Sequence, residues 1–349
     1  INVFIGQMDL RVGHQVVIWG RADGVNPTNN LTPMDMSLLS PMEDDMRLAN
    51  LALRAHLNFE PLPLRWEVVW LPFYRPNQLP NFELPAGVEA IPGVPVSVTL
   101  GDPDYPDFDI TNGTLATRIH LLLSAVEASV SYLVGTSVMP GIMLKDAAIT
   151  GSGANVTMAL TTYRHQVVGA DFATALLGFG VRGEVGYKVP FGLETYAYTP
   201  HPEIQYVLGL DREFLGQLQI IVQYNGKAVL RWDDEPGSAK PPADPMKKMA
   251  RPQVIARNQM IAGQLEQYQH SMTMRVAWNT LHETLHLEVM GMYNFSTEEL
   301  MLRPKISYDI ADALAVVVSG QIYIGPDDTM FGMIEESMSA GYLELRASV

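Results

Sequence analysis

Residues 49–70 read ANLALRAHLNFEPLPLRWEVVW and alternate between apolar and polar side chains at nearly every step. Apolar residues occupy every odd position from Ala49 to Phe59, and the alternation resumes over 64–70 after a proline-containing turn at 60–63. A period of two residues is that of an extended strand, because successive side chains of a strand point to opposite faces. Two such strands joined by a short turn predict a β-hairpin.

The same alternation recurs along the chain, for example over 117–134, 181–189, 217–224 and 343–349. Each expected strand has one apolar and one polar face. The expected strands are roughly nine to twelve residues long, which is longer than the strands of soluble sandwiches and sufficient to cross a bilayer at a tilt. The sequence therefore predicts an all-β, transmembrane antiparallel β-barrel. The competing interpretations are a large soluble all-β protein and an α/β enzyme in which the alternation arises by chance.

The lengths of the connections support the barrel. Long links are expected near 21–47, 75–112, 138–153, 191–201, 226–262 and 325–338, and tight links near 60, 125, 177, 212, 281 and 310. Outer-membrane barrels pair short periplasmic turns with long extracellular loops, so this alternation fits, provided that one external link near 296–299 is short. Counting from Asp9 gives about fourteen strands, and residues 1–5 resemble the end of another, so fourteen to sixteen are expected.

Composition restricts the class of protein. The formal net charge is −15, which argues against a nucleic-acid partner. The absence of cysteine excludes disulfides and thiolate metal sites. We find no apolar run long enough for a membrane-spanning helix and no break in composition, so residues 1–349 are expected to form a single outer-membrane β-barrel domain with some residues missing at both ends.

The stretch 282–286 reads HETLH, the H-E-x-x-H spelling of a zinc protease. That chemistry requires a helix, on which His282 and His286 would share one face. Both flanks alternate as strands do, which puts His282 in a turn and His286 on the next strand, about 13 Å along an extended chain. The sequence therefore predicts no zinc site here.

Two stretches carry a family resemblance. Residues 10–20 (LRVGHQVVIWG), with Asn26 and Pro27 after them, form one stretch, and VVGADFAT at 167–174 with GFGVRGEVGY at 178–187 forms the other. They resemble an uncharacterised family of Gram-negative outer-membrane β-barrels that is similar to alginate-export-type porins. The resemblance implies that the first stretch is a strand running into a long extracellular loop. Barrels of this kind usually end on an aromatic residue, so the end at Val349 predicts a short missing tail.

The polar faces of the strands supply candidate pore-lining side chains. These are Arg11, Gln15, Arg54, His56, Arg65, Glu67, Arg118, His120, Arg182, Glu184, Lys188, Arg275, His286, Glu288, Glu344 and Arg346. Rows of arginine can guide anionic or sugar-like solutes by hydrogen bonding. The alternative is that neighbouring arginine and glutamate side chains pair across the strands.

The link 75–112 is a candidate constriction loop. Its acidic residues are Glu83, Glu89, Asp102, Asp104, Asp107 and Asp109. Folded inward, this loop would place an acidic filter above a basic wall. A solvated acidic loop is the alternative, and a calcium site is disfavoured because the spacing of an EF-hand is absent. The link 226–262 is a second candidate lid.

These observations predict a channel of the bacterial outer membrane for passive diffusion of small hydrophilic solutes. The alternative is a structural or adaptor barrel, plugged by its loops, that anchors a partner. No catalytic group is recognisable, so we expect no enzyme, no metal and no cofactor. The expected partners are outer-membrane lipid and small hydrophilic solutes, with a second copy of the chain or another envelope protein also considered.

Overall fold

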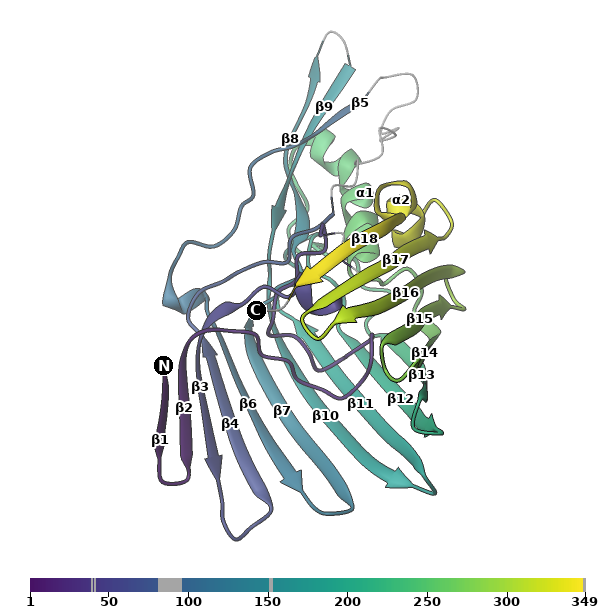
Figure 1. Ribbon diagram of the computed structural model, residues 1–349. Helices are drawn as coiled ribbons and strands as arrows, with labels where there is room; N and C mark the ends of the chain where they lie inside the picture. Colours follow the sequence, from purple (N-terminus) through teal and green to yellow (C-terminus); the bar gives the residue numbers. More distant parts are fainter. Residues whose placement is uncertain (39, 41, 81–95, 151–152, 348–349) are drawn as a thin grey trace.

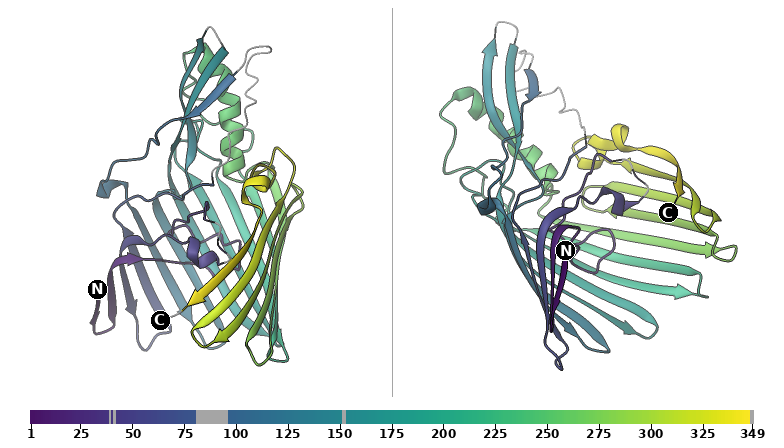
Figure 2. Two further views of the ribbon diagram at one scale, coloured as in Figure 1. Left: turned by 45° about the horizontal axis from the view of Figure 1, so that its top comes forward. Right: turned by 60° about the vertical axis from the view of Figure 1, so that its left-hand side comes forward.

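The computed structural model describes residues 1–349 except 39, 41, 81–95, 151–152 and 348–349. Its main feature is a curved sheet of 15 strands in which every neighbouring pair is antiparallel (Figures 1 and 2). In spatial order the strands are β1 (Asn2–Ile5), β2 (Met8–Gln15), β3 (Asn50–Asn58), β4 (Leu64–Leu71), β6 (Thr114–Leu122), β7 (Val126–Thr136), β10 (Arg164–Leu176), β11 (Phe179–Pro190), β12 (Glu203–Phe214), β13 (Leu218–Val229), β14 (Tyr268–Thr280), β15 (Leu285–Asn294), β16 (Glu299–Ala311), β17 (Leu314–Ile324) and β18 (Ala340–Ala347).

The all-β, antiparallel prediction is confirmed, as is its strand count: fourteen strands from β2 onward, with β1 as the fifteenth. Apart from β1, the strands of this sheet are eight to thirteen residues long. The tight links predicted at one end of the sheet are turns of a few residues, and the link between β15 and β16 at the other end is short as expected.

The long links are more structured than predicted. The link expected near 138–153 extends to β10 at Arg164 and contains two strands, β8 (Gly141–Thr150) and β9 (Gly153–Thr161), which form a three-stranded sheet with β5 (Val96–Leu100). This sheet rises above the main one beside helix α1 (Pro245–Ile261) (Figure 1).

The extension has its own small core. Val156 and Met158 on β9 pack with Val254 and Ile261 on α1, and this packing stabilises strands that project away from the main sheet. A second helix, α2 (Met330–Met338), lies between β17 and β18, and short 3₁₀ turns η1 (Glu43–Met46) and η2 (Ile110–Asn112) complete the elements. None of the helices described here is long and apolar enough to cross a membrane.

The main sheet is curved but not closed. Its two edges are β1 and β18, and neither is paired on its outer side among the strands described. β1 has four residues and β18 has eight, so direct pairing between them would leave half of β18 without a partner. The closed ring predicted from the alternation is therefore seen here as an open, curved sheet (Figure 2).

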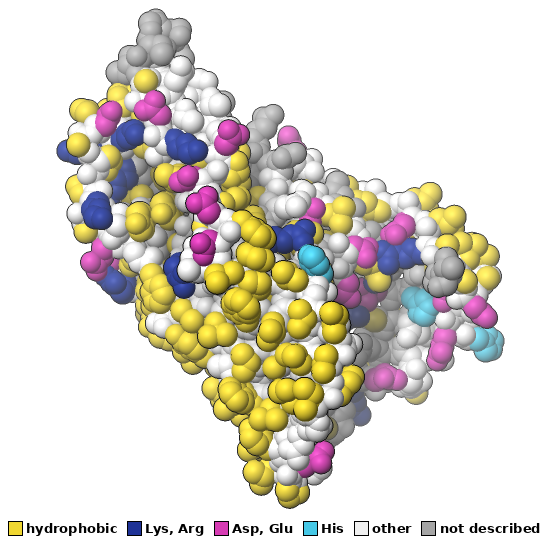
Figure 3. Space-filling view, turned by 90° about the vertical axis from the view of Figure 1, so that its left-hand side faces the viewer, with side chains coloured by type: hydrophobic (Ala, Val, Ile, Leu, Met, Phe, Trp, Pro, Cys, Tyr) yellow, Lys and Arg dark blue, Asp and Glu magenta, His cyan; other side chains and the backbone are white. Residues whose placement is uncertain are grey.

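In this sheet polar side chains are buried on the concave face and apolar side chains are exposed on the convex face, which is the reverse of the usual distribution in a water-soluble protein. On the concave face, Glu67 is 1% exposed and Asp171 is 5% exposed. On the convex face, Val130 is 61% exposed and Ile119 is 55% exposed. Figure 3 shows hydrophobic side chains gathered over the part of this outer surface that faces the viewer. An exposed apolar surface of this extent marks contact with lipid or with another protein.

The reversal predicts a strong asymmetry between substitutions on the two faces. Val130→Arg places a charge on the convex face and is expected to destabilise the protein in lipid by about 2–4 kcal/mol if the site lies near the bilayer midplane. Gln219→Arg, on the concave face of β13, is the matched control and should change stability little. Urea titration of the protein folded into liposomes measures both. Equal destabilisation by the two variants would contradict a lipid-facing convex surface.

Candidate functional site: the concave face and the segment that crosses it

Residues 16–48, here called the crossing segment, leave β2 and run across the concave face (purple in Figure 1). Apolar side chains of the segment pack on the wall near its start. Val17, Trp19 and Leu31 are each 1% exposed and pack with Val69 and Leu133 of the sheet. The indole Nε1 of Trp19 also donates to Glu67 at 3.3 Å. The segment is therefore held by a small apolar core inside an otherwise polar concavity.

Two glycines of the sheet provide the space for this approach. Gly169 on β10 and Gly186 on β11 are directly paired across the strands. A Cβ atom on Gly186 would lie 2.7 Å from the backbone oxygen of Pro27, and a Cβ on Gly169 would lie 2.7 Å from Cγ2 of Thr28. Both distances are below van der Waals contact, so these glycines are required for the segment to touch the wall.

A single buried carboxylate binds the segment at the same place. Glu184, 5% exposed, accepts hydrogen bonds from the backbone N–H groups of Arg21 (2.9 Å), Ala22 (3.2 Å) and Thr28 (2.7 Å), and from the Thr28 hydroxyl (2.9 Å). Hydrogen bonds to an ionised acceptor are stronger than neutral ones. The residues of the two stretches that carry the family resemblance thus meet in space, since Asn26 and Pro27 lie next to this contact.

Ion pairs hold Arg21 beside Glu184. Its Nε donates to Asp171 at 2.7 Å and its Nη1 to Glu127 at 2.7 Å. Asp171 is also bound by Arg118 at 2.8 Å and by the hydroxyl of Ser129. One carboxylate therefore joins the crossing segment to three strands, β6, β7 and β10.

The segment continues to the opposite part of the sheet. The backbone N–H of Asp23 donates to Gln223 on β13 at 2.6 Å, and the Asp23 carboxylate pairs with Arg275 on β14 at 3.2 Å. Asp45, near the end of the segment, pairs with Arg346 on β18. The crossing segment therefore contacts strands from β4 to β18. It is a loop that folds into the concavity and narrows it.

The Asp45 contact gives a pH prediction. A hydrogen bond from the Ser40 hydroxyl, together with Arg346, lowers the pKa of Asp45 below its usual value. A carboxylate with a lowered pKa stabilises the fold above its usual pKa, and this contribution is lost as the pH falls through the lowered value. We therefore expect the ion pair between Asp45 and Arg346 to persist from pH 7 to pH 5. The channel current that depends on this ion pair should be the same at both values. Current recordings at both values, with Asp45→Asn as the permanently uncharged reference, test it, and an Asp45-dependent change above pH 5 would contradict the assignment.

The structure places the predicted pore-lining residues on the concave face, and most of them form ion pairs or hydrogen bonds with other groups of the same wall. The Glu67 carboxylate accepts a hydrogen bond from Nε of Arg54 at 2.7 Å. Its oxygens also lie 3.2 Å from Nε2 of His120 and 3.5 Å from Nε2 of His56. The other pairs and contacts are Arg11 with Asp9, Gln15 with the Ala52 carbonyl, Arg65 with Asn58, Arg118 with Asp171, Arg182 with Asp211, Lys188 with Glu203, Arg275 with Glu288, His286 with Asp309, and Glu344 with Arg346.

The link 75–112 is placed differently from the expectation of an acidic filter. Asp102, Asp104, Asp107 and Asp109 are exposed, and the backbone of Asp104 pairs with Leu160 and Thr161 of the extension. Glu83 and Glu89 lie outside the described residues. Residues 96–104 of this link follow the outer extension, whereas the backbone of Gln78 pairs with Met34 and Met36 of the crossing segment. The loop that runs across the concave face is the crossing segment.

The HETLH stretch is a turn followed by a strand, as the alternation predicts. Leu281, His282 and Glu283 adopt left-handed backbone conformations with φ of 50°, 58° and 65°, and β15 begins at Leu285. His286 lies 2.9 Å from Asn279 and 3.1 Å from Asp309. Over the described ranges, no three His, Asp or Glu side chains are grouped as metal ligands would be.

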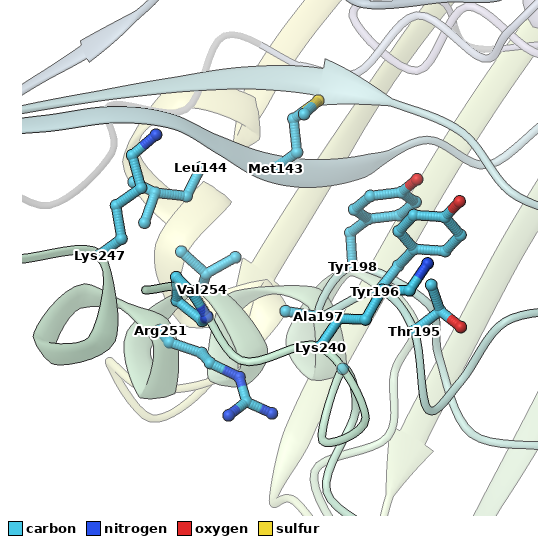
Figure 4. Close-up of a pocket in the computed structure, with 12 residues that line it drawn as sticks. Met143, Leu144, Thr195, Tyr196, Ala197, Tyr198, Lys240, Lys247, Arg251 and Val254 are labelled. Carbon is cyan, nitrogen blue, oxygen red and sulfur yellow. The ribbon is translucent and has the colours of Figure 1, made fainter. Parts of the chain in front are cut away.

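A small cleft of about 160 Å³ opens at the loop end between β8, α1 and the link that follows β11 (Figure 4). The rings of Tyr196 and Tyr198 stack in it with centroids 5.1 Å apart. Burial raises the pKa of the Tyr198 hydroxyl above its usual value. Lys240 and Arg251 also line the cleft, which therefore offers an aromatic surface beside cationic groups at the outer end of the protein.

Sequence reasoning missed the crossing segment, although part of its signal was visible. Gly169, within 167–174, and Gly186, within 178–187, fall on the polar face of their strands, where a side chain would normally project into the lumen. Glycine on such a face indicates close approach by another backbone. Nothing in the local sequence identified which segment makes that approach.

Comparisons with known proteins complete this description. No protein-family model and no curated protein sequence matches the chain. Among solved structures, the chain is similar to OccK5 (OpdH) of Pseudomonas aeruginosa, with 8% identity, a TM-score of 0.49, and coverage of 99% of this chain and 78% of that one. It is similar to OpdK of the same organism, solved with vanillate, at 6% identity and a TM-score of 0.46, covering 92% and 73%. A mutant of the Rh. blastica porin gives 10% identity and a TM-score of 0.41, covering 99% and 86%.

Proposed function

We propose that the protein is a channel of the bacterial outer membrane for passive diffusion of small solutes. The observation that carries this proposal is the reversal of polarity between the two faces of the main sheet. An apolar convex face requires lipid around it, and a charged concave face requires water inside it. We also propose that the protein is related to the outer-membrane barrels that are similar to alginate-export-type porins.

The crossing segment sets the width of the passage in this proposal. A barrel of about this many strands encloses more space than its own side chains fill, so a water-filled route is expected unless loops close it. The segment occupies part of that space and leaves one cavity lined by Asp23 and another lined by Val25 and Met36. We therefore expect narrow, selective diffusion and not a wide pore.

Conductance of the intact protein in planar lipid bilayers tests the proposal. Discrete steps of constant size are expected for a channel. The rival function, a plugged barrel that anchors a partner, is favoured by the number of contacts that fix the crossing segment. Absence of steps from protein whose folding in the membrane has been verified would favour the anchor and contradict the channel.

A further inference from the structure

A polar cavity of about 280 Å³ lies between the end of the crossing segment and strands β14–β18. Four cationic and three acidic residues line it: Arg47, Arg275, Arg303 and Lys305, with Asp23, Asp44 and Glu288. Arg275 pairs with Asp23 and Glu288, Lys305 with Glu288, and Arg47 with Asp44. Arg303 is the remaining cation, and no carboxylate of the described residues pairs with it.

Three buried polar atoms at this cavity have no hydrogen-bond partner in the part of the chain that the structure describes. They are Nε of Arg303, Oγ of Ser319 and the hydroxyl of Tyr342. Ser319 is directly opposite Tyr342 across β17 and β18, and opposite Lys305 across β16 and β17. Lys305, Ser319 and Tyr342 therefore form one row across the concave face, and Arg303 lies two residues from Lys305 on the same face of β16, beside this row.

The chemistry of Arg303, Ser319 and Tyr342 is that of an anion site. A guanidinium N–H and two hydroxyl groups can all donate hydrogen bonds. Buried donors without acceptors are unfavourable, and an anion with two or more oxygens would satisfy several of them together. The Arg303 guanidinium is held in place by a different atom, since its Nη2 donates a hydrogen bond to the hydroxyl of Tyr323 at 3.0 Å.

Arg303 also lines a second cavity, of about 440 Å³, which is predominantly apolar. Six methionines contribute to its wall: Met36, Met139, Met260, Met292, Met301 and Met330. Met330 packs on both the core of the extension and the core under α2, so the cavity lies where these two clusters meet. Methionine is flexible and polarisable, and suits an apolar surface that must adapt to ligands of different shapes.

We propose that Arg303, Ser319 and Tyr342 bind the carboxylate of an anionic solute whose apolar body occupies the methionine-lined cavity. This inference rests on the proposed channel function and specifies the class of solute as an amphiphilic monocarboxylate. The arrangement explains why Arg303 lacks an acidic partner on a wall where most charges are paired. It also explains an apolar cavity inside a concavity whose wall is largely polar.

Block of chloride current by added solutes tests the inference on the intact protein in planar bilayers. The probes are 4-butylbenzoate, acetate as an anion without an apolar body, and 4-butylbenzamide as the uncharged analogue. We expect 4-butylbenzoate to block at concentrations about tenfold or more below either other probe, which corresponds to about 1.4 kcal/mol per tenfold.

The variants separate the two parts of the site. Arg303→Gln should weaken the block by 4-butylbenzoate about tenfold, and Met292→Gln should weaken it without changing the block by acetate. The control is Arg212→Gln, which removes an arginine that packs on Phe179 and Phe214 on the convex face of β12. This control should leave the block unchanged.

The possible failures are distinguishable. If the wild-type protein gives no conductance steps, the channel proposal fails. If it conducts but the three probes block equally, or if Arg303→Gln behaves as Arg212→Gln does, the channel stands and the amphiphilic-anion site is overturned. Circular dichroism of each variant in lipid confirms that an altered block does not reflect loss of folding.

Discussion

Replacing Glu184 by alanine is expected to release the crossing segment from the wall and to raise single-channel conductance about twofold or more, since several charge-assisted hydrogen bonds of about 1.5–3 kcal/mol each are lost together. Four hydrogen-bond donors of Arg21, Ala22 and Thr28 converge on this one carboxylate. Alanine provides no acceptor, so the backbone N–H groups would have to find water instead. Planar-bilayer recording of step size is the direct measurement.

Glu213→Ala is the matched control for this experiment. Glu213 is an exposed glutamate near the end of the neighbouring strand β12, and its removal takes away the same charge without touching the crossing segment. We expect its steps to equal those of the wild type. If Glu184→Ala also gave wild-type steps, with trypsin cleavage after Arg21 no faster than before, then Glu184 would not be what holds the segment.

Introducing valine at Gly186 is expected to have the second large effect, because it fills the space that Pro27 occupies. The added Cβ would lie 2.7 Å from the Pro27 oxygen, which is a backbone atom and cannot rotate away. Overpacking of this kind costs about 1–3 kcal/mol, while valine itself is well suited to a strand. The strand should therefore remain and the crossing segment should move, which predicts faster tryptic cleavage within the segment and larger conductance steps.

Ala170→Val adds side-chain volume to β10 on the convex face and serves as the comparison. It lies next to Gly169 in sequence but points away from the crossing segment. Its cleavage rate and step size should match those of the wild type. Equal changes in Gly186→Val and Ala170→Val would mean that the effect is on the strand and not on the contact with Pro27.

The sequence predicted the fold well because one physical rule acts at every strand. Residues such as Val130 and Glu67 can be assigned to opposite faces from alternation alone, and the strand positions follow from that. The same rule predicted which charged side chains share the concave face. Whether Glu67 meets Arg54 then depends on the register between β3 and β4, which the tight turn of the hairpin largely determines.

The loops could not be predicted in the same way. Asp23 contacts Gln223 and Arg275, and these contacts depend on the final curvature of the sheet rather than on any local period. The acidic residues of 75–112 looked suited to a filter by charge alone, yet Asp104 pairs with the extension. The group formed by Arg303, Ser319 and Tyr342 could not be predicted either, because serine and tyrosine carry no signal until cross-strand register brings them together.

The sequence separations of the contacts made by the crossing segment imply an order of events during biogenesis. Arg21 lies 163 residues before Glu184, Asp23 lies 252 residues before Arg275, and Asp45 lies 301 residues before Arg346. Contacts between such distant parts of a chain form late, because the intervening loop must first be closed. The crossing segment is therefore expected to dock only after the strands that carry its partners have paired, so the concavity should be wider before docking than in the completed fold.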